Sequence, residues 1–327
     1  MTTATQKKSV PVQSEPAKTI PVFGFDLGNR WHKFGYGDSI HKIASYRAPL
    51  PAFQDIAPSY LPSGTHLIEG ESRTVVGSGA VGYGARPTYQ NADGAKWHHA
   101  KAFLFAALAE CNLFGDVSIK ELRTVCPDSQ SSEQVAALKS LKGSHQSTVD
   151  GKPINLSIAK ISIYDEGQPA WAIVVNSGLW HFPKALNGVL DLGGGTAIAR
   201  LITPEGRPVR QTELILPGTY GLAEKIQSHM GGPRSIPEIL NAIEDGSFSV
   251  PSGREFKSIF DSCLPEWIAD LRGEMRSRWS NWDGRYGQIA ICGGSASLAQ
   301  SLAQENPRYL LLDNPQTASL RGLLLNA

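Results

Sequence analysis

The chain has 327 residues, a formal net charge of +1 at pH 7 and a charged fraction of 19%. This length is enough for two lobes, each with its own core. The near-neutral charge argues against direct electrostatic binding to nucleic acid or to a membrane surface. We expect no membrane span and no signal peptide, because the densest apolar run, residues 102–109, has the length of a core helix.

The cysteines favour a reduced, cytoplasmic protein. None of the four belongs to a C-x-x-C pair, and several stand in apolar runs, at Cys111, Cys126, Cys263 and Cys292. This usage is typical of core residues and not of disulfides or metal ligands.

The chain begins with a polar segment and then a strand that ends in a glycine turn. Residues 1–20 contain two prolines and no apolar period, which predicts a disordered tail. Residues 22–46 predict three strands, and the first of them ends in Asp26-Leu27-Gly28-Asn29. Glycine carries no Cβ and tolerates positive φ, so backbone N–H groups can close around an anion there. The alternative is that Asp26 merely caps its own turn.

The middle of the chain alternates strands and helices. We expect a hairpin at 66–76, a buried helix at 95–111, a strand at 119–126, a helix to 141 and a strand at 154–164. This last strand breaks at Asp165-Glu166, and the apolar segment 170–175 that follows reads as a second strand. Glu166 alone would be interpreted as an exposed loop acid.

A second glycine turn lies at the centre of the sequence. The apolar strand from Gly188 ends at Asp191, the glycines Gly193, Gly194 and Gly195 follow, and a new strand starts after Thr196. A carboxylate before such a turn can hold hydrated Mg²⁺ that phosphates also bind. The alternative is a hairpin with an Asp-initiated turn.

The rest of the chain predicts strands at 207–216, 288–292 and 308–312 and helices at 220–230, 235–244, 256–282 and 315–325. A third glycine turn, Gly293-Gly294-Ser295, leads from a buried strand into a helix that runs to about residue 304. Glu224 and Lys225 lie on the helix that follows Thr219.

These three turns, in this order, resemble the actin-like ATPase superfamily, and the resemblance covers most of the chain after residue 20. It implies a two-lobed α/β fold of mixed five-stranded sheets flanked by helices, with lobe I at 21–187 and lobe II at 188–327. The strand leading to Glu166, together with Asn314-Pro315-Gln316 and Arg321-Gly322 near the end, is similar to the ParM/StbA plasmid-segregation proteins.

The resemblance also implies a ligand set, ATP with Mg²⁺ in the cleft between the lobes. Phosphates would lie on Asp26–Asn29 and on Asp191–Thr196, with Asp26 and Asp191 holding the metal through water. Glu166 would orient the attacking water, with Asp165 as the alternative. Gly293, Gly294 and Ser295 would lie under the adenosine, which Glu224 and Lys225 could also reach; a solvated ion pair is the other interpretation of these two.

The function implied is ATP-dependent self-assembly into filaments, with a DNA-binding adaptor linking them to a plasmid. Two alternatives stay open. One is a small-molecule kinase on the same ATP core, and the other is a nucleotide-binding scaffold without hydrolysis, for which Ile198 would be the sign because the family often has an aspartate there.

Overall fold

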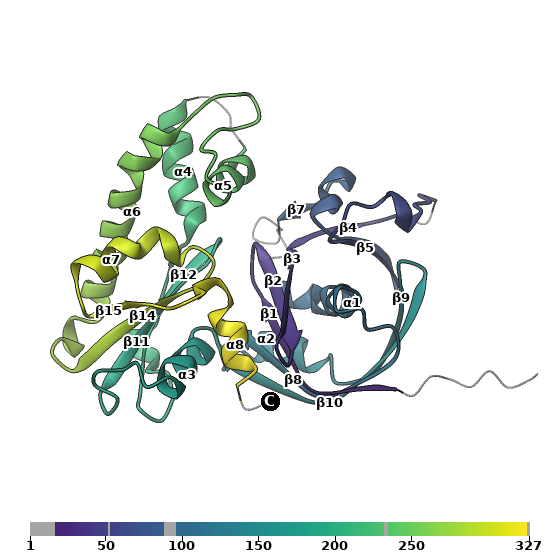
Figure 1. Ribbon diagram of the computed structural model, residues 1–327, viewed down its shortest axis with the longest axis horizontal. Helices are drawn as coiled ribbons and strands as arrows, with labels where there is room; N and C mark the ends of the chain where they lie inside the picture. Colours follow the sequence, from purple (N-terminus) through teal and green to yellow (C-terminus); the bar gives the residue numbers. More distant parts are fainter. Residues whose placement is uncertain (1–16, 52, 88–95, 232–234, 326–327) are drawn as a thin grey trace, which may run out of the picture.

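The computed structural model describes residues 17–51, 53–87, 96–231 and 235–325, and they form two lobes side by side (Figure 1). The first lobe contains a ten-stranded sheet of order β3-β2-β1-β8-β10-β9-β5-β6-β4-β7, and the second a five-stranded sheet of order β13-β12-β11-β14-β15. The predicted tail lies outside the described residues except at its end, where β1 begins at Lys18.

The first sheet consists of β1 (Lys18–Leu27), β2 (Trp31–Tyr36), β3 (Ser39–Ala44), β4 (Tyr46–Pro49), β5 (Thr65–Glu69), β6 (Arg73–Gly77), β7 (Arg86–Pro87), β8 (Gly115–Cys126), β9 (Gly143–Val149) and β10 (Lys152–Asp165). The second consists of β11 (Leu186–Leu192), β12 (Thr196–Ile202), β13 (Leu214–Pro217), β14 (Tyr286–Cys292) and β15 (Tyr309–Leu311). The α-helices are α1 (Ala100–Glu110), α2 (Ser132–Lys139), α3 (Gln168–Asn176), α4 (Thr219–Met230), α5 (Ile236–Glu244), α6 (Lys257–Arg278), α7 (Gln300–Glu305) and α8 (Ala318–Leu323).

The two sheets share one connectivity. β1 pairs antiparallel with β2 and parallel with β8, and β11 pairs antiparallel with β12 and parallel with β14. The orders β3-β2-β1-β8-β10 and β13-β12-β11-β14-β15 are therefore equivalent. The turns after Asp26 and Asp191 occupy matching places in the two lobes, as the repeated Asp-Leu-Gly pattern predicts.

The α/β class with mixed sheets is confirmed, with two differences. The first sheet exceeds five strands because β9 pairs with β5 and carries the sheet on through β6, β4 and β7. The strand predicted at 170–175 is wrong, since these residues belong to α3. Gly167 (φ 85°) turns the chain there, and Pro169 in the first helical turn needs no hydrogen-bond acceptor.

Each lobe is built around apolar helices. α1 lies within the curve of the first sheet, and its Phe103, Leu104, Phe105 and Leu108 side chains are fully buried (Figure 1). Burial of each such side chain contributes about 1.5–3 kcal/mol to stability. In the second lobe α4, α5 and α6 pack together against one face of the five-stranded sheet.

α3 and α8 lie between the lobes. Ala170 and Val174 of α3 pack in one cluster with Val189 and Ala290 of the second sheet, whereas α8 contacts both α3 and β1. The predicted division at residue 188 stays a prediction, and the packing joins α3 to the second sheet.

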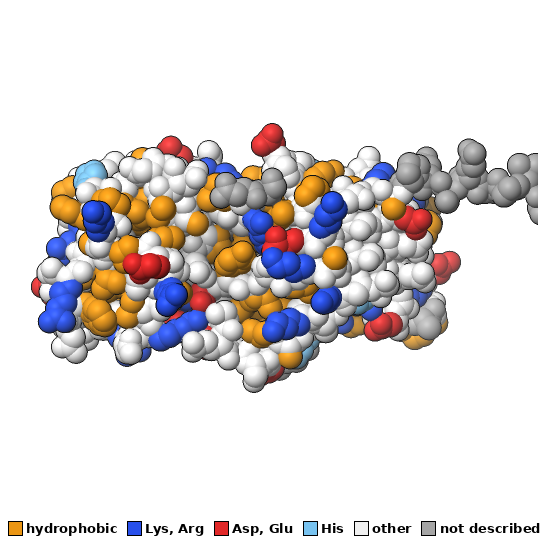
Figure 2. All heavy atoms as spheres, turned by 90° about the horizontal axis from the view of Figure 1, so that it is seen from below, with side chains coloured by type: hydrophobic (Ala, Val, Ile, Leu, Met, Phe, Trp, Pro, Cys, Tyr) orange, Lys and Arg blue, Asp and Glu red, His pale blue; other side chains and the backbone are white. Residues whose placement is uncertain are grey.

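The surface agrees with the balanced composition. Figure 2 shows the underside, where lysine and arginine side chains are interspersed with apolar and acidic ones. Within the described ranges, no helix combines the length and apolarity that crossing a bilayer requires. The four cysteines are free, and three of them are buried.

Candidate functional site

The three glycine turns meet at one pocket between the lobes. Six of the residues predicted for nucleotide binding line it, namely Gly28, Asn29, Gly193, Gly194, Gly294 and Ser295. Arg30, Trp31, Lys33, Leu298 and Gln316 line it as well. Strands that end at the cleft position all three turns, so the strand–turn pattern of the sequence located the pocket.

The first and second turns pack directly on each other. A Cβ added to Gly194 would lie 3.0 Å from the Arg30 Cβ, and one added to Gly195 would lie 2.7 Å from Asn29 Nδ2. Only glycine allows this approach without displacing the opposite turn. Parts of the chain about 165 residues apart in sequence thus form one surface.

The second turn is also fixed to α4 and to the third turn. The N–H groups of Thr219 and Tyr220, at the start of α4, donate to the carbonyls of Gly193 (3.2 Å) and Gly194 (2.8 Å). The N–H of Ser295 donates to Leu192 O at 2.9 Å, and the Ser295 and Thr219 hydroxyls are hydrogen-bonded. These bonds use backbone groups that a helix start otherwise leaves unpaired.

The floor of the site carries a cluster of charges. Lys33 Nζ donates to Asp26 Oδ2 at 2.6 Å. Burial lowers the pKa of Lys33, but Asp26 and Asp191 more than offset it, so the pKa is raised. Burial raises the pKa of Asp191 to about 6, an effect that Lys33 opposes and that Glu166 and Asp26 reinforce. Asp26, Lys33, Glu166 and Asp191 therefore form one electrostatic site.

This donor set fits a water-mediated Mg²⁺ site. Mg²⁺ retains several waters and is usually bound by one or two carboxylates together with substrate phosphates. In the described ranges no group of three or more His, Cys, Asp or Glu side chains could by itself hold a metal. The raised pKa of Asp191 indicates a carboxylate whose charge is poorly compensated, which a nearby cation would stabilise.

Glu166 follows β10, does not line the pocket itself, and lies close enough to Asp191 to raise the pKa of that carboxyl. Its N–H donates to Cys126 O at 2.9 Å, and its carboxylate accepts a hydrogen bond from Lys96 Nζ at 3.1 Å. Nothing in the sequence pointed to Lys96, because a lysine in the first turn of a predicted helix usually faces solvent.

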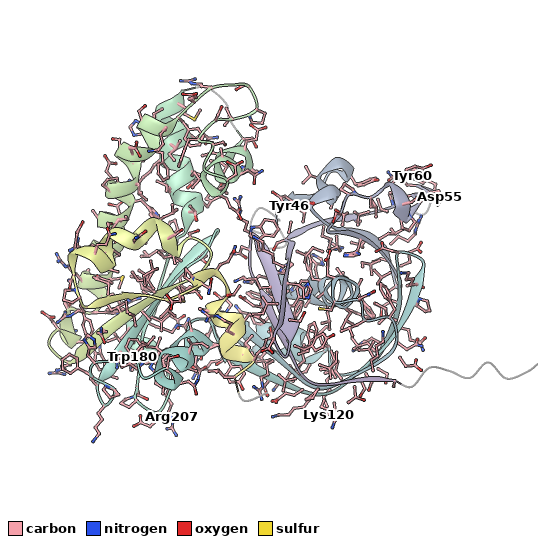
Figure 3. The ribbon with its side chains drawn as sticks, in the orientation of Figure 1. Tyr46, Asp55, Tyr60, Lys120, Trp180 and Arg207 are labelled. Carbon is pink, nitrogen blue, oxygen red and sulfur yellow. The ribbon has the colours of Figure 1, made fainter. Side chains whose placement is uncertain are left out.

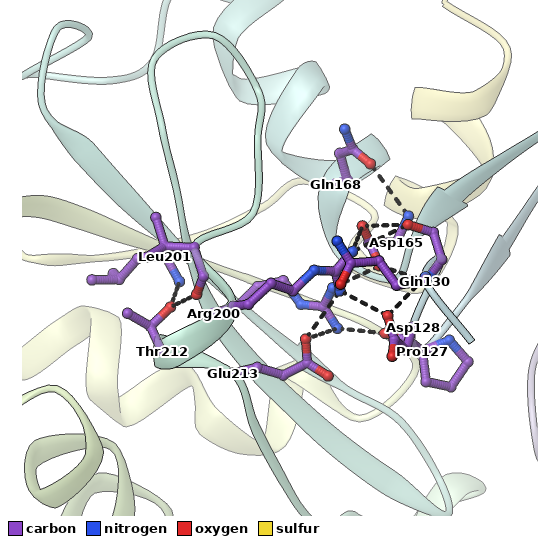
Figure 4. Close-up of polar contacts among 12 residues, drawn as sticks. Pro127, Asp128, Gln130, Asp165, Gln168, Arg200, Leu201, Thr212 and Glu213 are labelled. Atoms are coloured by element: carbon purple, nitrogen blue, oxygen red, sulfur yellow. Dashed lines mark hydrogen bonds and ion pairs between the residues drawn. The ribbon is translucent and has the colours of Figure 1, made fainter. Parts of the chain in front are cut away.

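Asp165, the alternative to Glu166, is engaged elsewhere (Figure 4). Its carboxylate accepts hydrogen bonds from Ser129 N (2.9 Å), from Ser129 Oγ (3.0 Å) and from Arg210 (2.7 Å), and Arg200 lies 3.4 Å away. Asp128 and Glu213 complete the set, which we call the inter-lobe network. Because its partners occupy the carboxylate, Asp165 joins the lobes and does not face the pocket.

Glu224 and Lys225 are not brought to the pocket. Leu222, Ala223 and Ile226 form the buried face of α4, which leaves Glu224 exposed. Lys225 Nζ lies 3.0 Å from Asp270 and 4.0 Å from Glu266 of α6. Lys225 therefore pairs with carboxylates of α6 and not with Glu224, the partner that the second interpretation gave it.

A second set of contacts, which we call the cleft latch, crosses the mouth of the pocket. Glu244 of α5 accepts hydrogen bonds from Arg30 Nε at 2.6 Å and Trp31 Nε1 at 3.0 Å, with Lys42 at 3.8 Å. Arg30 also donates to Asn241 Oδ1 at 2.9 Å. Tyr46, labelled in Figure 3 on the side of the first lobe facing α5, lies close by.

Comparison with solved structures defines the class. The chain has the actin-like fold, as its sequence motifs predict, and the similarity extends over about 93% of its length. The archaeal actin homolog Ta0583 matches with a TM-score of 0.75 and 17% identity over 93% of this chain and 98% of that one. A structure of the same homolog in complex with ADP matches with a TM-score of 0.71.

Within that class, ParM proteins are among the similar structures. The apo ParM of pSK41 matches with a TM-score of 0.68 and 17% identity over 93% of this chain and 96% of that one. A ParM from Clostridium botulinum, solved as a 15-stranded filament, matches with a TM-score of 0.70 and 16% identity over 94% and 98%. By sequence, no family model and no curated protein matches the chain.

Proposed function

We propose that the protein is an ATP-hydrolysing, filament-forming actin-like protein of the ParM type that acts in plasmid segregation in the cytoplasm. The observation that carries this proposal is the meeting of the three glycine turns and Lys33 at one inter-lobe pocket. Asp26 and Asp191 lie beside that lysine, and Glu166 lies within electrostatic range of Asp191. An ADP complex and filament structures among the proteins of the same fold support it.

In this proposal each turn binds a different part of the nucleotide. The backbones of Gly28–Asn29 and Gly193–Thr196 and the ammonium of Lys33 bind the phosphates, where positioning and charge compensation provide most of the catalysis. Asp26 and Asp191 hold Mg²⁺ through water, and the ion compensates phosphate charge when bound. Glu166 orients the attacking water. The adenosine lies against Gly293–Ser295, Leu298 and Gln316.

Assembly would follow from closure of the cleft. The relative angle of the lobes sets the relative angle of surfaces on both, and a head-to-tail contact that does not close into a ring extends as a filament. A DNA-binding adaptor would connect the filament to the plasmid, since the chain's own charge of +1 gives no strong attraction to DNA.

The test is sedimentation and light scattering with and without Mg²⁺-ATP. We expect scattering to rise above a threshold protein concentration and to decay as ATP is consumed, and Asp191→Ala to abolish the rise while Asp313→Ala, outside the pocket, retains it. A wild-type protein that stays monomeric at tens of micromolar with a non-hydrolysable ATP analogue would contradict the filament function.

A further inference from the structure

In the part of the chain that the structure describes, one side chain holds the Glu166 carboxylate. Among the described residues, Lys96 donates its only side-chain hydrogen bond, from Nζ to Oε1 at 3.1 Å. Lys96 belongs to the 3₁₀ turn Lys96–His99 that precedes α1, 70 residues away in sequence. The side chains of Lys96 and Glu166 are only 7% and 15% exposed. A buried ammonium is costly unless it is paired, so the two groups hold each other in place.

Lys33 and Lys96 are each hydrogen-bonded to a carboxylate of their own. Lys33 is bonded to Asp26 at 2.6 Å, which leaves Lys96 for Glu166. His32 is affected by both lysines. Burial, followed by the charges of Lys96 and Lys33, holds the pKa of His32 well below its ordinary value. Its ring packs on Phe103 at 3.8 Å between centroids and stays neutral, so it offers Glu166 no competing cation.

We propose that Lys96 is a positioning residue for the hydrolysis reaction, acting through Glu166; this rests on the proposed function. The Lys96 ammonium holds Oε1 of Glu166 in place, so that Oε2 of the same carboxylate faces the attacking water in a single orientation. In the reaction the water oxygen bonds to the γ-phosphorus while the bond to the β–γ bridging oxygen breaks. ADP leaves with that electron pair, and the water proton passes to the released phosphate or to solvent.

Loss of Lys96 has a specific consequence. Without the ammonium, the Glu166 carboxylate loses its hydrogen-bond partner among the described residues and still lies within electrostatic range of Asp191. The carboxylate then leaves its position, while the glycine turns that bind the nucleotide are unchanged. The effect falls on kcat and not on nucleotide affinity, because misplacing a group in the transition state costs rate rather than ground-state binding.

The experiment compares Lys96→Met, Lys96→Arg and the control Lys101→Met in steady-state ATP hydrolysis and in binding of a fluorescent ADP analogue. Lys101 lies in α1 and forms an exposed ion pair with Glu71, so its loss removes the same charge away from the cleft. We expect Lys96→Met to lower kcat roughly 10- to 100-fold with analogue affinity changed less than about threefold, Lys96→Arg to recover part of the loss, and Lys101→Met to match wild type.

A double variant covers the case in which Lys96→Met does not fold. Lys96→Met with Glu166→Gln leaves no buried charge unpaired, and its kcat should equal that of Glu166→Gln alone. A further multiplicative loss would overturn the positioning role, as would wild-type kcat in folded Lys96→Met. A wild-type protein that binds the analogue but does not hydrolyse ATP would instead overturn the proposed function and this role together.

Discussion

Removal of Glu244 should speed the release of nucleotide, because the cleft latch crosses the mouth of the pocket. Arg30 contacts this carboxylate through Nε at 2.6 Å and Nη2 at 2.5 Å, and Trp31 Nε1 donates to it at 3.0 Å. Arg30 and Glu244 are 19% and 37% exposed, so solvent screening reduces the ion pair to a surface-like value of about 0–1 kcal/mol. The indole hydrogen bond is made to a carboxylate that is 37% exposed, so it adds about 1 kcal/mol, the net value of an ordinary hydrogen bond.

The sum, about 1–2 kcal/mol, converts to a factor of roughly 5–30 in the ratio of latched to open cleft. If release requires the latch to open, the dissociation rate of a fluorescent nucleotide should rise by this factor in Glu244→Ala. Stopped-flow displacement with excess unlabelled nucleotide measures it. Glu238→Ala is the matched control, since Glu238 lies on the same helix and its side chain forms no hydrogen bond or ion pair among the described residues.

Salt gives a second readout. Raising ionic strength from 0.1 M to 1 M shortens the Debye length from about 10 Å to about 3 Å and weakens exposed pairs. Release from the wild type should therefore speed up with salt, and release from Glu244→Ala should respond less. Equal dissociation rates and equal salt responses for wild type and Glu244→Ala would refute the latch.

Two further predictions concern stability and the third turn. Burial lowers the pKa of His66, but hydrogen bonds to Asp150 and Glu110 overcome this and raise the pKa to about 9. Protonated His66 therefore adds on the order of 3 kcal/mol to the free energy of unfolding below about pH 6.5, and this contribution is lost as pH rises through 9. The urea midpoint should fall between pH 6 and pH 9.5, and an equal fall in His66→Gln would contradict the role of His66. Gly294→Val should weaken nucleotide binding with little change in melting temperature, because a Cβ there lies 3.7 Å or more from its neighbours. Gly293→Ala should instead lower the melting temperature, since φ is 97° and its Cβ would overlap Asp191 and Leu192 O; the reverse pattern in thermal melts and binding would exclude both assignments.

The parts of the site that could be predicted from sequence are those with a local cause. A strand that ends in Asp-Leu-Gly predicts, from a few adjacent residues, both the turn and the position of the aspartate before it. The same pattern at Asp26 and Asp191 therefore predicted two equivalent turns, and the matching strand orders of the two sheets confirm the equivalence. The apolar run before Gly293 similarly located the third turn.

The parts that could not be predicted depend on contacts between distant segments. Arg30 and Glu244 are 214 residues apart, and each taken alone is an ordinary surface charge. Lys96 meets Glu166 only because the turn before α1 packs beside the end of β10. The strand predicted at 170–175 is wrong because a short apolar run has no period that separates a strand from a buried helix. The left-handed conformation of Gly167 starts the helix instead.

The two sets of contacts between the lobes differ in burial, and this difference indicates how the cleft opens. In the inter-lobe network Arg200 and Asp165 are 1% and 4% exposed, so separating them would leave two buried charges unpaired. The cleft latch is exposed to solvent, and water replaces its lost contacts at small cost. A rotation that opens the latch while it preserves the network costs the least free energy. The lobes should therefore pivot about Asp165 and Arg200, which lie next to Glu166. The displacement is then largest at the cleft latch, at the mouth of the pocket, and smallest near Glu166.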